Sequence, residues 1–186
     1  METNPLLAQD LIRLALLEDV GDGDHSSLAC VPADATKRAR LLVKQEGVLA
    51  GVEVALLIFK EVDPALSVEV FLEDGAVIAP GQIVLTVEGS ARSILQAERL
   101  VLNIMQRMSG IATYTRSLVE LISDLPVALL DTRKTTPNFR VFEKMATRIG
   151  GATNHRMGLY DMIMLKDNHI DYAGGIEAAI KRTHAY

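Results

Sequence analysis

Two short apolar runs in the second half of the chain each end at charged residues. Val127-Ala-Leu-Leu130 leads into Asp131-Thr-Arg-Lys134, and Met162-Ile-Met-Leu165 leads into Lys166-Asp-Asn-His169. Continuous apolar runs of this length are typical of parallel strands that are buried on both faces. Because α/β sheets and barrels bind their ligands at the carboxyl ends of such strands, the sequence predicts an α/β fold with a cationic site at that edge.

The segment that contains these runs is locally basic. Between Asp131 and His169 there are seven Lys or Arg and four Asp or Glu, in a chain whose formal net charge is −5. Arg holds a carboxylate or phosphate through two parallel hydrogen bonds, and Lys supplies a compact point charge. The candidate ligands of a small polyanion are Arg133, Lys134, His155, Arg156 and Lys166. Two alternatives stay open: the charges only mark where strands leave the core, or His155 and His169 are structural histidines.

Composition limits the class of protein. At 186 residues, with 49% hydrophobic and 23% charged residues, the chain can bury a substantial core in one or two domains. It contains no apolar run of about eighteen residues and no signal-peptide pattern, so we expect a cytoplasmic protein that does not bind a membrane. The overall acidity argues against a nucleic-acid partner, and the single Cys30 excludes an intrachain disulfide.

The hydrophobic pattern predicts helices and strands along the whole chain. Helical spacing covers residues 5–19 and 90–124, whereas residues 37–88 have the pattern of short strands and turns around a helix at residues 51–59. Two of these strands are expected at residues 68–72 and 81–87. From residue 127 onward, strands and helices alternate, and two helical faces are predicted. The first comprises Phe139, Phe142, Met145, Ala146 and Ile149, and the second covers Ile176 to His184. This rhythm is typical of the opening of a (β/α) barrel.

One basic residue stands apart from the cluster. Arg99 lies in the helical segment beside an apolar face, and we expect it to be buried or half-buried. The alternative is an ordinary surface side chain that extends to solvent along the helix. Ser109-Gly110, further along the same segment, permits a bend before the next helix.

Six motifs occur in an order that resembles the quinolinate phosphoribosyltransferase family. The motifs are Glu18-Asp-Val-Gly-Asp-Gly-Asp24, Glu98-Arg-Leu-Val-Leu-Asn103, Gln106-Arg-Met-Ser-Gly-Ile-Ala-Thr113, Asp131-Thr-Arg-Lys-Thr-Thr-Pro137, Asn154-His-Arg156 and Leu165-Lys-Asp-Asn-His169. A single motif would be weak, whereas six in order across the chain are specific.

The resemblance implies an α/β protein with an N-terminal α/β sandwich domain, residues 1–112, joined by a helical connection to the beginning of a (β/α) barrel, residues 113–186. Members of the family convert quinolinate and phosphoribosyl pyrophosphate to nicotinate mononucleotide, CO₂ and pyrophosphate, with Mg²⁺, in NAD biosynthesis. They are pentosyltransferases. A homodimer with shared active sites is implied as well.

The resemblance also assigns roles to individual residues. Lys134 and Lys166 are implied as catalytic. The implied substrate-binding residues are Arg99, Arg133, Lys134, His155, Arg156 and Lys166. Arg99 is implied to reach into the active site of the partner subunit, which makes the active unit at least a dimer.

The chain departs from the family pattern in two places and in length. Asn138-Phe139 stands where the family often has Gly-Leu, and Ala152 interrupts a glycine run. The family continues well beyond Tyr186, so we expect a chain truncated at its C-terminus, with the acidic residues near the ribose and Mg²⁺ lying outside it. No metal ligand is therefore assigned. We also expect residues 1–186 by themselves to bind anions weakly and to turn over negligibly.

Two other functions remain as alternatives. One is a related phosphoribosyltransferase-like enzyme with another substrate, which the choice between quinolinate and nicotinate would distinguish. The other is a lipoyl or biotinyl carrier module, suggested by the turn-rich segment from Glu73 to Gln82. A carrier module needs a lysine at an exposed hairpin tip, and no Lys lies between Lys60 and Lys134.

Overall fold

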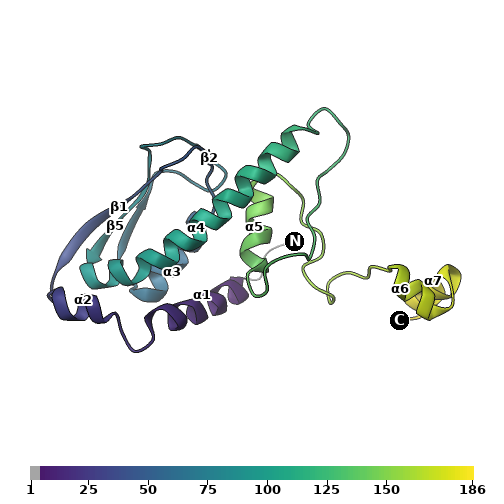
Figure 1. Ribbon diagram of the computed structural model, residues 1–186, viewed down its shortest axis with the longest axis horizontal. Helices are drawn as coiled ribbons and strands as arrows, with labels where there is room; N and C mark the ends of the chain where they lie inside the picture. Colours follow the sequence, from purple (N-terminus) through teal and green to yellow (C-terminus); the bar gives the residue numbers. More distant parts are fainter. Residues whose placement is uncertain (1–4) are drawn as a thin grey trace. The chain divides into compact units, whose positions relative to one another are not determined.

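The computed structural model describes residues 5–186 in two compact units, one that ends at His155 and one that comprises Arg156–Tyr186. The first unit contains α1 (Pro5–Val20), α2 (His25–Cys30), β1 (Thr36–Leu42), β2 (Gly47–Val48), α3 (Val52–Val62), β3 (Ser67–Val70), β4 (Val77–Ile78), β5 (Ile83–Ser90), α4 (Ala91–Glu120) and α5 (Arg140–Ile149) (Figure 1). The second unit contains α6 (Asp167–Ala173) and α7 (Ile176–Ala185). The predicted domain boundary between residues 112 and 113 falls inside α4 and does not coincide with the division between these two units. The boundary therefore stays a prediction.

The sheet of the first unit is antiparallel and has three strands in the order β1-β5-β3. β5 is central and pairs with β1 from Thr36 opposite Ser90, with an irregularity between Leu41 and Leu42. β2 and β4 form a separate two-stranded ribbon. The strands at residues 67–70 and 83–90 confirm two of the predicted strands.

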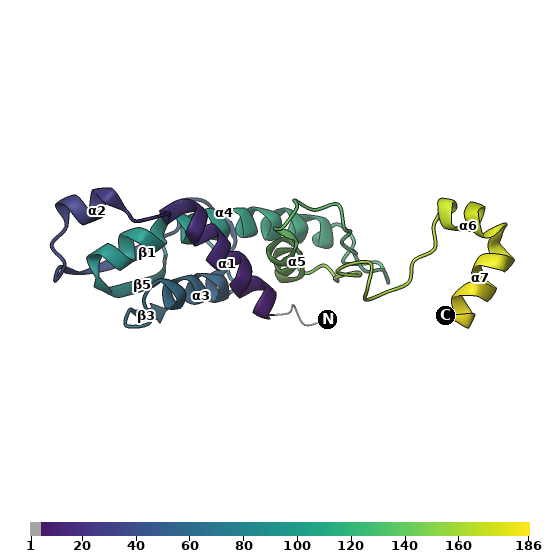
Figure 2. The same ribbon diagram turned by 90° about the horizontal axis from the view of Figure 1, so that it is seen from below.

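Helices α1, α3 and α4 enclose the core of the first unit together with the sheet. α3 and α4 contact each other, and α1 contacts both (Figure 2). Ile12 of α1 and Ile58 of α3 are fully buried in the same core as Leu85 and Val87 of β5. Burial of an aliphatic side chain of this size contributes about 1.5–3 kcal/mol to stability. The shared core therefore holds α4, which carries the neighbouring helix α5, against the sheet.

α4 is one unbroken helix of 30 residues, so the bend predicted at Ser109-Gly110 does not interrupt it. Two hydroxyl groups of α4 accept hydrogen bonds from the backbone around β2. Ser109 Oγ accepts a hydrogen bond from Ala50 N–H at 3.0 Å, and Thr113 Oγ1 accepts one from Val48 N–H at 2.8 Å. These bonds satisfy backbone donors that the short ribbon leaves unpaired.

α5 packs against the C-terminal half of α4, and a glycine permits the close approach. A Cβ at Gly150 would lie 2.6 Å from the carbonyl oxygen of Ala112 and 2.6 Å from Cβ of Thr115. The predicted apolar face of this helix is confirmed, with Phe142, Met145 and Ala146 buried. α5 therefore has a fixed position, which matters because it carries part of the candidate site.

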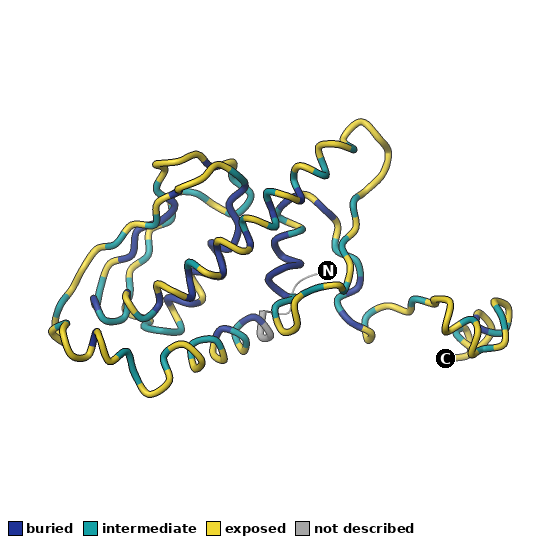
Figure 3. The backbone as a smooth tube through the Cα atoms, viewed as in Figure 1, coloured by how far each residue is buried: buried dark blue, intermediate teal, exposed yellow. Residues whose placement is uncertain are grey.

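The two apolar runs predicted as buried parallel strands do not form strands, and this prediction is wrong. Residues 127–131 make a single parallel bridge between Leu130 and Thr153, and Val127 is 60% exposed. The chain between α4 and α5 is mostly exposed or intermediate (Figure 3). In the second unit, Ile163 is 57% exposed. The reason is that a buried strand needs partner strands at its edges and a layer on each face, and within the described residues the two runs have only that one bridge.

The second unit holds two short helices that contact each other. α6 ends at Gly174 in the left-handed region, with φ of 88°, and α7 begins after Gly175. The helix predicted at the end of the chain is confirmed as α7, whereas α6 was not predicted. None of the helices within residues 5–186 is long and apolar enough to cross a bilayer.

Candidate functional site

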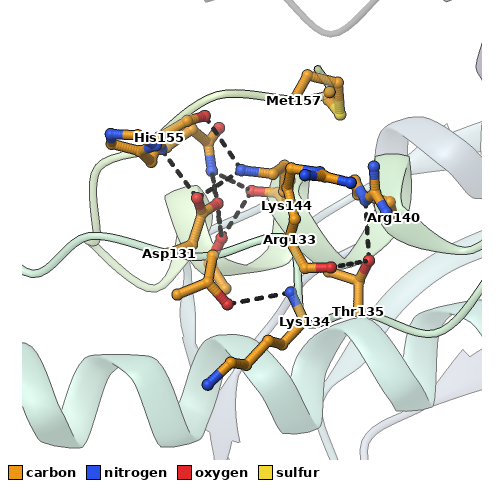
Figure 4. Close-up of polar contacts among 12 residues, drawn as sticks. Asp131, Arg133, Lys134, Thr135, Arg140, Lys144, His155 and Met157 are labelled. Carbon is orange, nitrogen blue, oxygen red and sulfur yellow. Dashed lines mark hydrogen bonds and ion pairs between the residues drawn. The ribbon is translucent and has the colours of Figure 1, made fainter. Parts of the chain in front are cut away.

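A buried carboxylate organises the segment that follows residue 130. The Asp131 side chain is 7% exposed and accepts bonds at both oxygens (Figure 4). Oδ1 accepts from His155 N–H at 2.8 Å and also from Lys144 Nζ. Oδ2 accepts from Asn154 Nδ2 at 2.6 Å and from Thr147 Oγ1 at 3.3 Å. The carboxylate therefore joins three pieces of chain: its own loop, helix α5 and residues 154–155.

Lys144 completes this network from α5. Its side chain is 1% exposed, and besides the ion pair with Asp131 it donates a hydrogen bond to the His155 carbonyl oxygen at 3.1 Å. Asn154 Nδ2 donates to the Lys144 carbonyl oxygen at 2.9 Å. A buried ion pair is tolerated only when further hydrogen bonds satisfy its remaining donors and acceptors, and this pair meets that condition.

Arg133 and Lys134 follow directly in a tight loop. Thr135 N–H donates to the Arg133 carbonyl oxygen at 2.9 Å, and Lys134 N–H donates to Thr132 Oγ1 at 3.1 Å. Arg133 is half-buried, and its Nε has no hydrogen-bond partner within the described residues although the atom is buried. The Lys134 side chain is exposed and extends away from Asp131 (Figure 4). An unpaired buried donor is costly, and such donors are often reserved for a ligand.

A second buried carboxylate holds the next part of the loop. Glu143 Oε2 accepts from Thr136 N–H at 3.0 Å, and Oε1 accepts from Thr136 Oγ1 at 2.9 Å and from the Arg107 guanidinium of α4. Burial by itself would raise the pKa of Glu143, but the bonds from Arg107 and Thr136 outweigh it and hold that pKa below its ordinary value. Glu143 thus stays ionised and ties the loop to α4.

The departure at Asn138 fits the geometry of the loop. Phe139 N–H donates to the Thr136 carbonyl oxygen at 3.1 Å, which closes a turn with Pro137 and Asn138 in its middle. Asn138 has φ of 62°, in the left-handed region that favours glycine, and among other residues Asn adopts this region most readily. The exchange of Gly for Asn therefore leaves the turn intact.

Arg99 does not join this network, and the prediction that it is buried or half-buried is wrong. It is exposed on α4, where it lines a shallow groove with Asp24, Ser26 and Ser27 around α2. The contacts of α5 and Gly150 with α4 lie at Arg107 and Ala112, which corresponds to about 12–20 Å from Arg99 along the helix axis. Arg99 is therefore separate from Arg133, Lys134 and His155 within this chain.

The two remaining predicted residues belong to the second unit. The Arg156 guanidinium donates from Nη1 to the Met162 carbonyl oxygen at 3.3 Å. Lys166 precedes α6, and its backbone N–H donates to Nδ1 of His169 at 3.0 Å. His169 thereby closes the first turn of the helix, which is the structural role left open for it.

Of the predicted ligands, the structure brings Arg133, Lys134 and His155 onto two neighbouring segments. The sequence interpretation missed the groups that hold these segments: Asp131, Lys144, Thr147 and Asn154 in one network, and Arg107, Thr136 and Glu143 in the other. A signal for them was present. Glu143 and Lys144 interrupt an apolar helical face, and charges placed in such a face require buried partners.

Two domains of one protein family match the chain in order. The N-terminal domain of quinolinate phosphoribosyl transferase matches residues 24–109, and the C-terminal domain matches residues 111–186. The chain belongs to the quinolinate phosphoribosyltransferase family. The turn-rich segment that suggested a carrier module lies inside the N-terminal match.

Proteins similar to this quinolinate phosphoribosyltransferase family member include two plant enzymes. A nicotinate-nucleotide pyrophosphorylase (carboxylating) of Oryza sativa subsp. japonica is 51% identical over 172 residues, which are 92% of this chain and 46% of the relative. A quinolinate phosphoribosyltransferase (decarboxylating) of Nicotiana tabacum is 48% identical over 177 residues, which are 95% of this chain and 50% of the relative. The chain spans about half the length of these curated relatives.

Solved structures confirm the mixed α/β fold class. NadC from Streptococcus pyogenes is 41% identical with a TM-score of 0.92, covering 100% of this chain and 66% of that protein. A nicotinate-nucleotide pyrophosphorylase from Francisella tularensis is 36% identical with a TM-score of 0.89, covering 98% of this chain and 64% of that protein. A human nicotinic acid phosphoribosyltransferase, at 16% identity and a TM-score of 0.59, shares the fold alone.

The described residues offer no dedicated protein cage for Mg²⁺. Mg²⁺ prefers several oxygen ligands in an octahedral arrangement. Residues 5–186 contain no group of three or more His, Cys, Asp or Glu that could hold a metal ion. These residues do not fit a protein cage for the ion, so no chemical step is assigned to it.

Proposed function

We propose that the protein transfers the phosphoribosyl group of phosphoribosyl pyrophosphate to quinolinate, with decarboxylation to nicotinate mononucleotide. The observation that carries this proposal is the match of both domains of one enzyme family, in order, over residues 24–186. The site chemistry supports it. Two ring carboxylates need several cationic donors, and Arg133, Lys134 and His155 lie on segments that Asp131 joins.

Arg133 is proposed as the main quinolinate ligand in the first unit. Its buried, unpaired Nε is a donor that an incoming carboxylate can satisfy. Lys134, whose side chain is exposed to solvent, is proposed to neutralise phosphate or pyrophosphate charge. Arg156 and Lys166 remain predicted ligands on the family resemblance, and Lys134 and Lys166 remain the predicted catalytic residues.

The proposed chemistry needs orientation and charge rather than a covalent nucleophile. The bond from ribose C1 to pyrophosphate breaks with its electrons leaving on pyrophosphate, and the ring nitrogen of quinolinate bonds to C1. The nitrogen then carries positive charge, which stabilises the carbanion left when the neighbouring carboxylate departs as CO₂. A proton from solvent completes the ring. Cations that hold both carboxylates would lower the barrier of the first step by aligning the nitrogen.

Three further proposals accompany this activity. Mg²⁺ is proposed to arrive bound to the phosphates of phosphoribosyl pyrophosphate, with the ligands supplied mainly by the substrate. The active unit is proposed to be a homodimer or a higher homo-oligomer, which the exposure of Arg99 and its distance from α5 favour. The place of action is proposed to be the cytoplasm.

The reaction is tested by assaying the full gene product with phosphoribosyl pyrophosphate and Mg²⁺. Quinolinate should give nicotinate mononucleotide and CO₂ in equal amounts, measured by mass spectrometry and by release of labelled carbon. Nicotinate serves as the control substrate, because it lacks the carboxylate that departs. A comparable rate with nicotinate would instead favour a related phosphoribosyltransferase with another substrate.

A further inference from the structure

The backbone of His155 is held on both sides by a single buried ion pair. Asp131 Oδ1 accepts its N–H at 2.8 Å, and Lys144 Nζ donates to its carbonyl oxygen at 3.1 Å. The two side chains are 7% and 1% exposed. The pair therefore fixes the residue from both peptide groups, while the imidazole itself stays half-buried at the surface of the unit.

Besides the ion pair with Lys144, Asp131 accepts hydrogen bonds from one small region of the chain. Asn154, Thr147 and the His155 backbone donate them, and these groups belong to α5 or to the segment that follows it. Buried ion pairs are often no more stabilising than apolar side chains of the same volume. A pair of this kind is therefore better explained by the geometry that it imposes than by stability.

We propose that Asp131 and Lys144 are positioning residues that hold His155 for contact with a carboxylate of the anionic substrate. This inference rests on the proposed function for the identity of that substrate. Neither side chain contacts the ligand. Their effect passes through the His155 backbone, which sets the direction of the imidazole relative to the Asp131 loop and hence to Arg133.

The test replaces both charges at once, because the loss of one would leave the other buried and uncompensated. The Asp131→Asn/Lys144→Met double variant keeps the approximate volume of both side chains and one acceptor for His155 N–H. Arg148→Met, at an exposed basic position of the same helix, is the matched control. If the double variant does not fold, Asp131→Asn/Lys144→Gln replaces it, since it also removes both charges and the longer amide retains one donor toward position 131.

Two readouts separate positioning from stability. Hydrogen exchange of the His155 amide, followed by nuclear magnetic resonance with the amide of Ala146 as reference, should become at least about tenfold faster in the double variant. Calorimetry should show about tenfold weaker quinolinate binding in the double variant. In a His155→Ala background the same double substitution should change the dissociation constant by less than about twofold, because the contact it supports is already lost.

The outcomes distinguish this inference from the proposed function. Unchanged exchange at His155 would overturn the positioning role whatever the ligand does, as would an equal loss of affinity in the His155→Ala background. Faster exchange together with no quinolinate binding by the unsubstituted protein would support positioning and contradict the proposed substrate. An Arg148→Met variant with the same defects as the double variant would also overturn the inference.

Discussion

At the residue scale, Arg133 combines positive charge with a buried donor that no residue of the described chain satisfies. Leaving such a donor unpaired costs about 1–3 kcal/mol in the absence of ligand. A residue kept at that cost is expected to contribute to binding rather than to folding. Stability and ligand affinity should therefore respond in opposite directions when Arg133 is replaced.

The Arg133→Met variant tests this expectation. We predict that quinolinate affinity falls about a hundredfold, while the free energy of unfolding stays unchanged or rises by up to about 1 kcal/mol. Calorimetry gives the affinity, and urea unfolding gives the stability. Arg148→Met, at an exposed position of α5, controls for the removal of a positive charge. A large loss of stability together with the loss of binding would show that Arg133 is mainly structural.

Glu143 makes stability depend on acid pH. Its pKa in the folded protein is lowered from an ordinary value of 4.5. The stability that ionised Glu143 contributes is therefore fully present above about pH 4.5. It is lost as the pH falls through the lower pKa that Glu143 has in the folded protein. We predict that at pH 7 the Glu143→Gln variant unfolds at a lower urea concentration than the unsubstituted protein. The difference between their urea midpoints should narrow below about pH 4.5. Glu73→Gln, at an exposed position, is the control. If the difference between the urea midpoints widened in acid, the pKa of Glu143 would be raised by folding and not lowered.

At the scale of elements, the approach of α5 to α4 depends on Gly150. A side chain there would meet the backbone oxygen of Ala112, which cannot move without disturbing α4. Gly110, in the middle of α4, is a matched comparison, because a Cβ at this position would meet nothing within 4 Å beyond its own helix. The two glycines thus separate the effect of packing from the effect of helix propensity.

We predict opposite effects for the two alanine substitutions. Gly150→Ala should destabilise the protein by about 1–3 kcal/mol, because the helices must separate. Gly110→Ala should stabilise it by about 0.5–1 kcal/mol, because Ala restricts the unfolded chain and favours the helix. Thermal and urea unfolding measure both. Equal effects of the two substitutions would contradict the packing of α5 on α4.

The sequence predicted the helices more successfully than the strands of the second half, for a physical reason. Helices such as α5 and α7 form from local hydrogen bonds and one apolar face, which the sequence carries within a few turns. The run from Val127 to Leu130 needs neighbouring strands, and its structure depends on residues far away in the sequence. The cations of the candidate site were visible as charges that follow apolar runs, whereas the residues of α5 that support them were hidden inside an apolar pattern.

At the scale of the whole molecule, Arg99 tests whether two copies share one site. It is exposed on α4, about 12–20 Å along the helix from the residues that contact α5 and Gly150. We predict that mixing Arg99→Ala with Lys166→Ala full gene product restores part of the activity that each variant lacks alone, because some mixed dimers contain one intact composite site. Native mass spectrometry verifies the mixed dimers. Their presence without restored activity would place Arg99 outside any shared site.

The loop after Asp131 is proposed to recognise a dicarboxylate. Titration of residues 1–186 with quinolinate by calorimetry tests it most directly, with nicotinate as the monocarboxylate comparison. We predict one site per chain, affinity at least about tenfold greater for quinolinate than for nicotinate, and weaker binding at high salt. Equal affinity for the two acids, or unchanged quinolinate binding by Arg133→Met, would contradict it.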